Sequence, residues 1–155
     1  MIRLSRLSDY AVSLMTHIAH AAGDTHNAHD LAETAHLPAP TVSKILATLA
    51  REELLESVRG RQGGYRLAQD STEISVEDII AAVDGPIALT QCVDPGPGSC
   101  DVEAFCPSSA HWHRINEAIR QALGGVTLAE LTAPVAFPEQ RFVDRPPVVG
   151  AGSGG

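Results

Sequence analysis

The chain has 155 residues, 44% of them apolar, and a formal net charge of −8 at pH 7. This length suits one compact core with an appendage, and no stretch approaches the ~20 consecutive apolar residues of a membrane span. The N-terminus has no apolar run of signal-peptide length, so we expect a soluble, cytoplasmic protein without a membrane partner. Residues 1–70 carry seven basic and eight acidic side chains, whereas residues 71–155 carry four and eleven. A nucleic acid would therefore bind the N-terminal half, although the overall acidity argues against such a partner.

Three helices are predicted before the first glycine-rich turn. Apolar side chains recur at helical spacing over residues 8–22, which predicts the first helix. Asn27 can cap a second helix over residues 28–36. Proline is tolerated in the first turn of a helix, so a third helix can begin near Pro40.

The third helix has two distinct faces. Its apolar positions follow the i, i+3, i+4, i+7 pattern of a buried face: Val42, Ile45, Leu46 and Leu49. The opposite face carries the hydroxyls and the cation of Thr41, Ser43 and Lys44. Two amphipathic helices joined by a short proline-containing turn are typical of a helix-turn-helix.

A basic hairpin follows the third helix. Residues 54–58 and 65–68 are predicted strands around a turn in which glycines permit positive φ. The hairpin carries three arginines: Arg59, Arg61 and Arg66. A helix-turn-helix followed directly by a basic hairpin is typical of a winged helix, whose wing can contact phosphates or enter a minor groove.

Three more helices are expected beyond the hairpin. Ser75 and Asp78 form a capping-box variant for a helix that ends at a Gly-Pro pair, and Ser108 or Ser109 begins a long helix that reaches Leu123. The apolar stripe of the long helix consists of Trp112, Ile115, Ile119, Ala122 and Leu123. No later helix of similar length could cover this stripe, so we expect it to pack against a second subunit. Thr127 and Glu130 form a capping box for a last short helix over residues 128–131.

These elements predict a mainly α fold with a small β-hairpin wing. Residues 1–86 are expected to form a winged helix-turn-helix DNA-binding domain, and residues 87–107 a cysteine-containing loop too rich in Pro and Gly for regular structure. Residues 108–133 would form the dimerisation helix and the short final helix. The Pro- and Gly-rich residues 134–155 are expected to be a disordered tail.

All three cysteines lie within residues 92–106. Their odd number and the expected cytoplasmic location argue against a disulfide framework and favour metal or redox chemistry. Two alternatives stay open: the thiols could be small buried hydrophobes, or they could bind zinc together with one histidine.

Three sequence features together resemble the Rrf2 family of bacterial winged-helix regulators, over about residues 1–133. They are LSRLSDYAVSLM at the start, SVRGRQGGYRLA at the wing, and C-x7-C-x5-C before HWHRINEAI. Within the family the chain is most similar to regulators of the SUF iron-sulfur assembly operon. The resemblance implies a homodimer with crossed long helices and an iron-sulfur cluster, [4Fe-4S] or [2Fe-2S], held by Cys92, Cys100 and Cys106. The seven residues between the first two cysteines depart from the five that are common in cluster-binding relatives.

The resemblance leaves several candidates for a fourth ligand. Asp9 occupies the position from which nitric-oxide-sensing relatives supply an aspartate of the partner subunit. His111 and His113 are closer in sequence, and solvent or a small molecule is a further candidate. Ser109 occupies the position of the family histidine. Asp9 could instead, or in addition, stabilise the first helical turn through its dipole.

The candidate DNA-binding residues are the exposed cations and hydroxyls of the N-terminal half: Arg3, Arg6, Thr41, Ser43, Lys44, Arg59, Arg61 and Arg66. The alternative is that this cationic surface is only solvated. Better-studied relatives have a glutamate in place of Ser43, so their cytosine contact is not expected here.

We therefore expect a repressor of iron-sulfur cluster assembly genes whose DNA affinity is controlled by its cluster. Two alternatives remain: a thiol-redox or nitric-oxide-responsive regulator of the same fold, and a small metal-binding electron-transfer or scaffold protein. The sequence has no Ser/His/Asp arrangement, phosphate loop or paired catalytic carboxylates, so neither catalysis nor a small-molecule substrate is expected.

Overall fold

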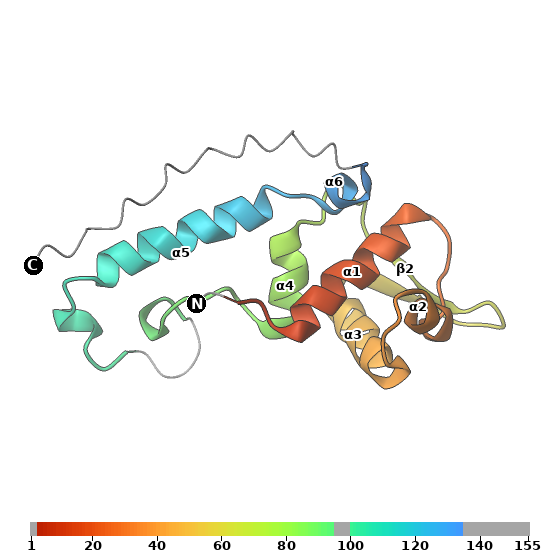
Figure 1. The fold of residues 1–155 in the computed structure, drawn as a ribbon, viewed down its shortest axis with the longest axis horizontal. Helices are drawn as coiled ribbons and strands as arrows, with labels where there is room; N and C mark the ends of the chain where they lie inside the picture. Colours follow the sequence, from red (N-terminus) through yellow and green to blue (C-terminus); the bar gives the residue numbers. More distant parts are fainter. Residues whose placement is uncertain (1–2, 95–99, 135–155) are drawn as a thin grey trace, which may run out of the picture.

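The computed structural model describes residues 3–94 and 100–134. In chain order its elements are α1 (Arg6–His20), α2 (Ala28–Thr34), α3 (Ala39–Arg51), β1 (Leu55–Val58), β2 (Gly64–Leu67), α4 (Val76–Asp84), η1 (Gln91–Val93), η2 (Glu103–Phe105), α5 (Ser109–Gly124) and α6 (Leu128–Thr132). The hairpin and the first four helices gather at one end, and α5 extends away from them (Figure 1). The mainly α fold with a two-stranded wing is confirmed. Residues 135–155, nearly all of the predicted tail, lie outside the described residues.

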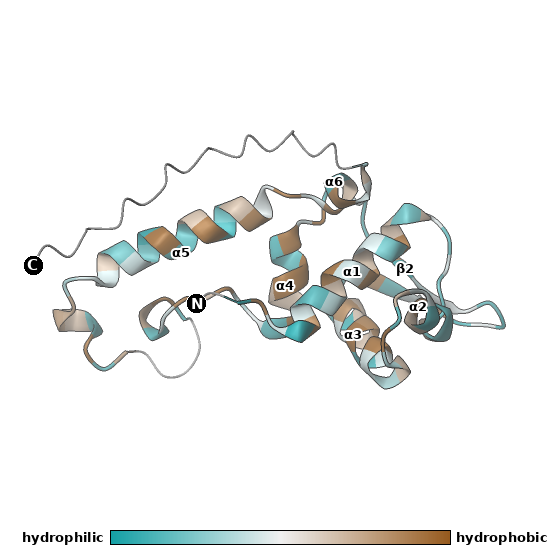
Figure 2. Cartoon of the chain, in the orientation of Figure 1, coloured by the Kyte–Doolittle hydropathy of each residue, from teal (hydrophilic) through white to brown (hydrophobic). Residues whose placement is uncertain are grey.

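One hydrophobic core joins α1, α3, α4 and α6. Its largest fully buried side chains include Leu14, Met15, Ile18, Ile45, Leu46, Leu49, Ile79 and Leu128. The hydrophobic faces of α1, α3 and α4 turn toward one another (Figure 2). Each such side chain contributes about 1.5–3 kcal/mol by leaving water, so this core holds the helix-turn-helix together.

Helix α1 begins at Arg6, rather than at Ser8 as the periodicity predicts. The side chain of Ser5 accepts a hydrogen bond from the Ser8 N–H at 3.0 Å, which is the geometry of an N-cap. The helix ends at His20. Ser8 consequently lies inside the helix, where it is completely buried.

The final helix returns to the core of the N-terminal domain. Thr127 forms the predicted capping box with Glu130, and its backbone pairs with Ser75, the N-cap of α4. The Leu128 N–H donates to the carbonyl of Ile74 at 2.8 Å, and the Leu128 side chain is fully buried. Both ends of the segment that carries α5 are therefore attached to the same core.

The cysteine segment contains more regular structure than its Pro and Gly content predicts. Short 3-10 turns, η1 and η2, stand before and after the undescribed residues 95–99. A 3-10 turn needs only three residues, so it can form between prolines where a longer helix cannot.

The wing is attached to the segment between α1 and α2. Tyr65 of β2 and His26 exchange backbone hydrogen bonds of 2.8 and 2.9 Å. The backbone of His26 passes so close to Gly64 that a Cβ at position 64 would overlap the His26 carbonyl. Only glycine allows this approach.

We predict that Gly64→Ala separates the wing from His26 and lowers both thermal stability and DNA affinity. The obstructing atoms belong to the backbone, so no side-chain rotation can relieve the overlap, and we expect a loss of about 1–3 kcal/mol. Thermal melts and DNA titrations measure the two effects. Gly125→Ala is the milder comparison, because an added Cβ there meets the Gln121 carbonyl oxygen at 3.2 Å, a contact that a shift of a few tenths of an ångström relieves. An equally small effect at both positions would contradict the close approach.

Candidate nucleic-acid interface and cysteine loop

Helix α3 presents the face expected of a recognition helix. Its buried side chains are Val42, Ile45, Leu46 and Leu49, as the periodicity predicts. Ser43 and Lys44 are exposed, and Thr41 is half-buried. The first turn of α3 has no acidic residue. Hydroxyl and ammonium donors on such a face can pair with base edges or phosphates.

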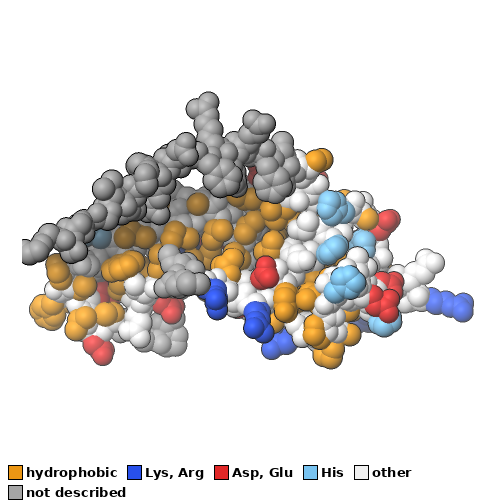
Figure 3. Space-filling view, in the orientation of Figure 1, with side chains coloured by type: hydrophobic (Ala, Val, Ile, Leu, Met, Phe, Trp, Pro, Cys, Tyr) orange, Lys and Arg blue, Asp and Glu red, His pale blue; other side chains and the backbone are white. Residues whose placement is uncertain are grey.

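The three wing arginines lie in two different environments. Arg66 faces Glu56 across the strand pair, and its guanidinium forms an ion pair with that carboxylate. Arg59 and Arg61 are exposed beyond the strands, and neither has an ion-pair partner within residues 3–94 and 100–134. The hairpin projects from the helices, with basic side chains at its tip (Figure 3). Uncompensated positive charge is therefore concentrated at the end of the wing.

The start of α1 adds further charge and a contact with α4. Arg3 and Arg6 are exposed, and so is Asp9. The buried hydroxyl of Ser8 donates a short hydrogen bond to the carboxylate of Asp84, the last residue of α4. The segment that leads to the cysteines begins at the next residue. The start of α1 and the start of this segment are thus held together.

All three cysteines are free thiols and half-buried. Cys92 lies in η1, with its Sγ 3.1 Å from the hydroxyl of Thr90, and Cys106 directly follows η2. Three reduced thiols are a donor set that suits an iron-sulfur cluster. Among the described residues, however, no three His, Cys, Asp or Glu side chains are grouped closely enough to hold a metal ion. The donors fit the cofactor, but the described part of a single chain does not bring them together.

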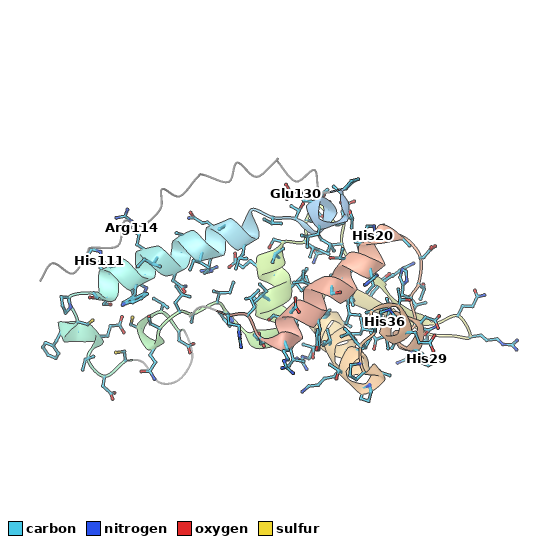
Figure 4. The ribbon with its side chains drawn as sticks, viewed as in Figure 1. His20, His29, His36, His111, Arg114 and Glu130 are labelled. Carbon is cyan, nitrogen blue, oxygen red and sulfur yellow. The ribbon has the colours of Figure 1, made fainter. Side chains whose placement is uncertain are left out.

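The candidate fourth ligands lie on different elements. Asp9 is at the start of α1, whereas His111 and His113 are in the first turns of α5. Nε2 of His113 lies 3.5 Å from Oε1 of Glu103, a residue between the second and third cysteines. His111 is exposed and lies at the opposite end of the molecule from the histidines labelled beside α1 and α2 (Figure 4). The histidines near the DNA-reading helices are therefore remote from the cysteine loop.

Asn116 is a functional candidate that the sequence prediction missed. Its side chain is 6% exposed, and its Nδ2 donates to the carbonyl of Ile87 at 2.9 Å. Its Oδ1 accepts from the N–H of Leu89 at 3.0 Å. The amide thereby fastens the segment before Cys92 to α5.

A second polar contact joins α5 to α4. Nε of Arg120 lies 2.6 Å from Oε1 of Glu77, and this hydrogen bond is the main reason that the pKa of Arg120 is raised above its ordinary value. The last residue of α5, Gly124, passes close to the same glutamate. Asn116, Arg120 and Gly124 are spaced four apart, so they share one face of the helix.

The predicted apolar stripe of α5 is largely uncovered. Trp112 is 38% and Ile115 44% exposed, and Ile119 and Leu123 are half-buried. Phe105 of η2 is 89% exposed. Hydrophobic side chains gather over this half of the molecule (Figure 3). Such an area on one chain is typical of a surface that another protein covers.

No described helix is long and apolar enough to cross a membrane. The profile of the Rrf2 family, described as an iron-dependent transcriptional regulator, matches residues 4–134. The chain belongs to the Rrf2 family. The Rrf2 match spans the reading helices, the wing, the cysteine loop and α5.

Named Rrf2 relatives and related structures agree with this assignment. The transcriptional regulator IscR of Vibrio cholerae is 33% identical, over 84% of this chain and 75% of its own length. The structure of T. potens IscR has a TM-score of 0.65 and 29% identity, covering 84% of this chain and 85% of that one. CymR, the global cysteine regulator of B. subtilis, has a TM-score of 0.67 and 25% identity, covering 85% and 97%.

The expected resemblance and the absence of catalysis are thus confirmed, because the family and its named members are transcriptional regulators. Membership also implies DNA binding through the winged helix. It disfavours the interpretation as an electron-transfer or scaffold protein.

We predict that Ser8→Ala lowers the free energy of unfolding by about 1 kcal/mol, because a buried hydroxyl loses its hydrogen bond to Asp84 while that exposed carboxylate can be rehydrated. Urea unfolding measures the loss. Ser13→Ala removes an exposed hydroxyl from the same helix and is expected to change stability by less than ~0.5 kcal/mol. Equal stabilities of the two variants would show that the contact contributes nothing.

Proposed function

We propose that this protein is a cytoplasmic, homodimeric repressor of iron-sulfur cluster assembly genes, whose operator affinity depends on a cluster held by Cys92, Cys100 and Cys106. The observation that carries the proposal is the set of three free thiols on a loop fastened between the reading domain and an uncovered helix. When bound, a cluster would supply iron-thiolate bonds that join distant parts of this loop. Its nuclearity, [4Fe-4S] or [2Fe-2S], is left open.

The chain's own contacts supply a route from the loop to the DNA. Asn116 fixes the segment before Cys92 on α5. Ser8 of α1 bonds Asp84, the last residue of α4, directly before that segment begins. Through these contacts, a change in the arrangement of the loop would act on the helix that carries Arg6. A regulator needs two conformations with different DNA affinity. The hydrogen bonds of Asn116 and Ser8 are where these two conformations would differ.

Two copies of α5 would form the dimer, and each reading domain would bind half of a pseudo-palindromic operator. The support is the stripe that includes Trp112 and Ile115, which no described residue of the chain covers fully. Polar contacts occupy the face of α5 that meets its own domain. The apolar face is left for the partner.

We propose that Asp9 of the partner subunit is the fourth cluster ligand. It is exposed and belongs to no group of three metal-ligating side chains among the described residues, which suits a ligand that reaches across a dimer. His111 and His113 are the alternatives. His113 is less available as a ligand, because its Nε2 lies beside the Glu103 carboxylate.

A thiol-responsive regulator is the second candidate. The support is the likeness to two CymR proteins. The CymR of B. subtilis is described as a global cysteine regulator. The CymR of Staphylococcus aureus has been solved in an oxidised form, with 27% identity and a TM-score of 0.67. In this candidate the same three thiols would respond directly to oxidants, without a metal.

Anaerobic purification distinguishes the two candidates. We predict iron, sulfide and a broad absorption band near ~400 nm in the wild-type protein, and the loss of all three in Cys100→Ala. The variant should remain a folded dimer that no longer regulates transcription. Colourless, iron-free wild-type protein that still regulates its operator would favour the thiol-responsive candidate, and an unfolded variant would indicate a structural role for Cys100.

The wing arginines are predicted to contribute unequally to DNA binding. Arg59→Ala should weaken operator binding by about 1–3 kcal/mol, because its charge is unpaired. The double variant Glu56→Ala/Arg66→Ala removes a neutral pair and should cost less than about 1 kcal/mol. Titrations at two salt concentrations measure both. Equal losses would show that Arg66 contacts DNA directly.

The dimer surface can be tested with Ile115→Glu. A carboxylate buried without a partner between two helices should weaken the dimer by about 3 kcal/mol or more, which sedimentation would detect as monomer. Glu117→Gln, an exposed change on the same helix, is the control. A variant that remains dimeric at low concentration would place the interface elsewhere.

A further inference from the structure

Asn116 is the one residue of α5 that is buried. An amide removed from water costs free energy unless its donor and its acceptor are both hydrogen-bonded. Both are bonded here, to the carbonyl of Ile87 and the N–H of Leu89. The Asn116 side chain thus bonds the Ile87 carbonyl and the Leu89 N–H in the way that the backbone of a neighbouring strand would.

The residues directly after this contact place Cys92. The Thr90 carbonyl accepts the N–H of Val93 at 3.1 Å and closes η1, and the Thr90 hydroxyl lies 3.1 Å from the sulfur of Cys92. η1 also packs against α5. The first cysteine is therefore positioned relative to α5 before any cofactor binds.

The other end of the loop is attached to the same helix. The Cys106 carbonyl accepts the N–H of Ser109, the first residue of α5, at 3.3 Å. Asn116 lies two turns further along, about 10 Å at 1.5 Å per residue. Helix α5 thus holds both ends of the loop that contains the three thiols, and Asn116 is the contact that holds the Cys92 end.

We infer that Asn116 is a positioning residue for the cofactor site: it holds Cys92 ready as a ligand, and the Thr90 hydroxyl donates to the Cys92 sulfur once that sulfur is bound to metal. The inference rests on the proposed function. Holding a ligand in place lowers the entropy cost of ordering it when the metal binds. Loss of a residue that orients a metal ligand commonly lowers metal affinity by roughly 10- to 100-fold.

The test uses anaerobically purified full-length protein and its variants. Asn116→Leu keeps a similar volume but removes both hydrogen bonds, so the Leu89 amide should exchange faster and an iron chelator should remove the cluster about 10- to 100-fold faster. Thr90→Val should lower the reduction potential of the cluster, whereas Thr90→Ser, which keeps the hydroxyl, should restore it.

Two controls separate positioning from general destabilisation. Gln121→Leu removes an exposed amide from the same helix, and Ile80→Val weakens the core of α4; both should lose the cluster at the wild-type rate. Unchanged cluster loss in Asn116→Leu, with coloured wild-type protein, would overturn the inference and leave the proposed function intact. Colourless wild-type protein would overturn the proposed function, and the inference with it.

Discussion

The contact between the Asn116 amide and the backbone of Ile87 and Leu89 is the constraint on which the arrangement of this molecule depends. Helix α5 has its apolar side chains on a face that its own chain leaves largely open, so the hydrophobic effect alone cannot hold it to the winged helix. Polar contacts take that role. They require correct geometry at each atom, so they fix the position of α5 more narrowly than an apolar seam of the same size would.

Separate surfaces of this short chain carry the candidate DNA contacts, the metal ligands and the subunit interface. The exposed face of α3 and the tip of the wing carry donors for DNA, and the cysteine loop carries soft metal ligands. The stripe on α5 offers area for a second subunit. The hydrogen bond from Ser8 to Asp84 joins the start of α1 to the end of α4, directly before the segment that leads to the cysteines. Membership of the Rrf2 family is consistent with such a division.

Local signals predicted most of the fold. The capping boxes of α4 and α6 and the apolar period of α3 each lie within a few residues of sequence, and each was found as expected. Asn116 was missed because its partners lie 27 and 29 residues away, a distance at which no periodicity carries information. The ion pair of Arg66 depended on strand register, which the turn alone did not specify. The ligand set stays a prediction, because residues 3–94 and 100–134 of one chain do not assemble it.

The uneven support of α5 has a mechanical consequence. Its second half, from Asn116 to Gly124, is tied to the loop and to α4, and α6 anchors the segment beyond it. Its first half, Ser109 to Ile115, extends about 10 Å past the last of these ties. A bend of about 10° in the helix at Asn116 would displace Ser109 by roughly 2 Å, together with the Cys106 carbonyl that accepts its N–H. Such a bend would shift the third cysteine relative to the first, because the Cys92 end of the loop is held at Asn116 itself.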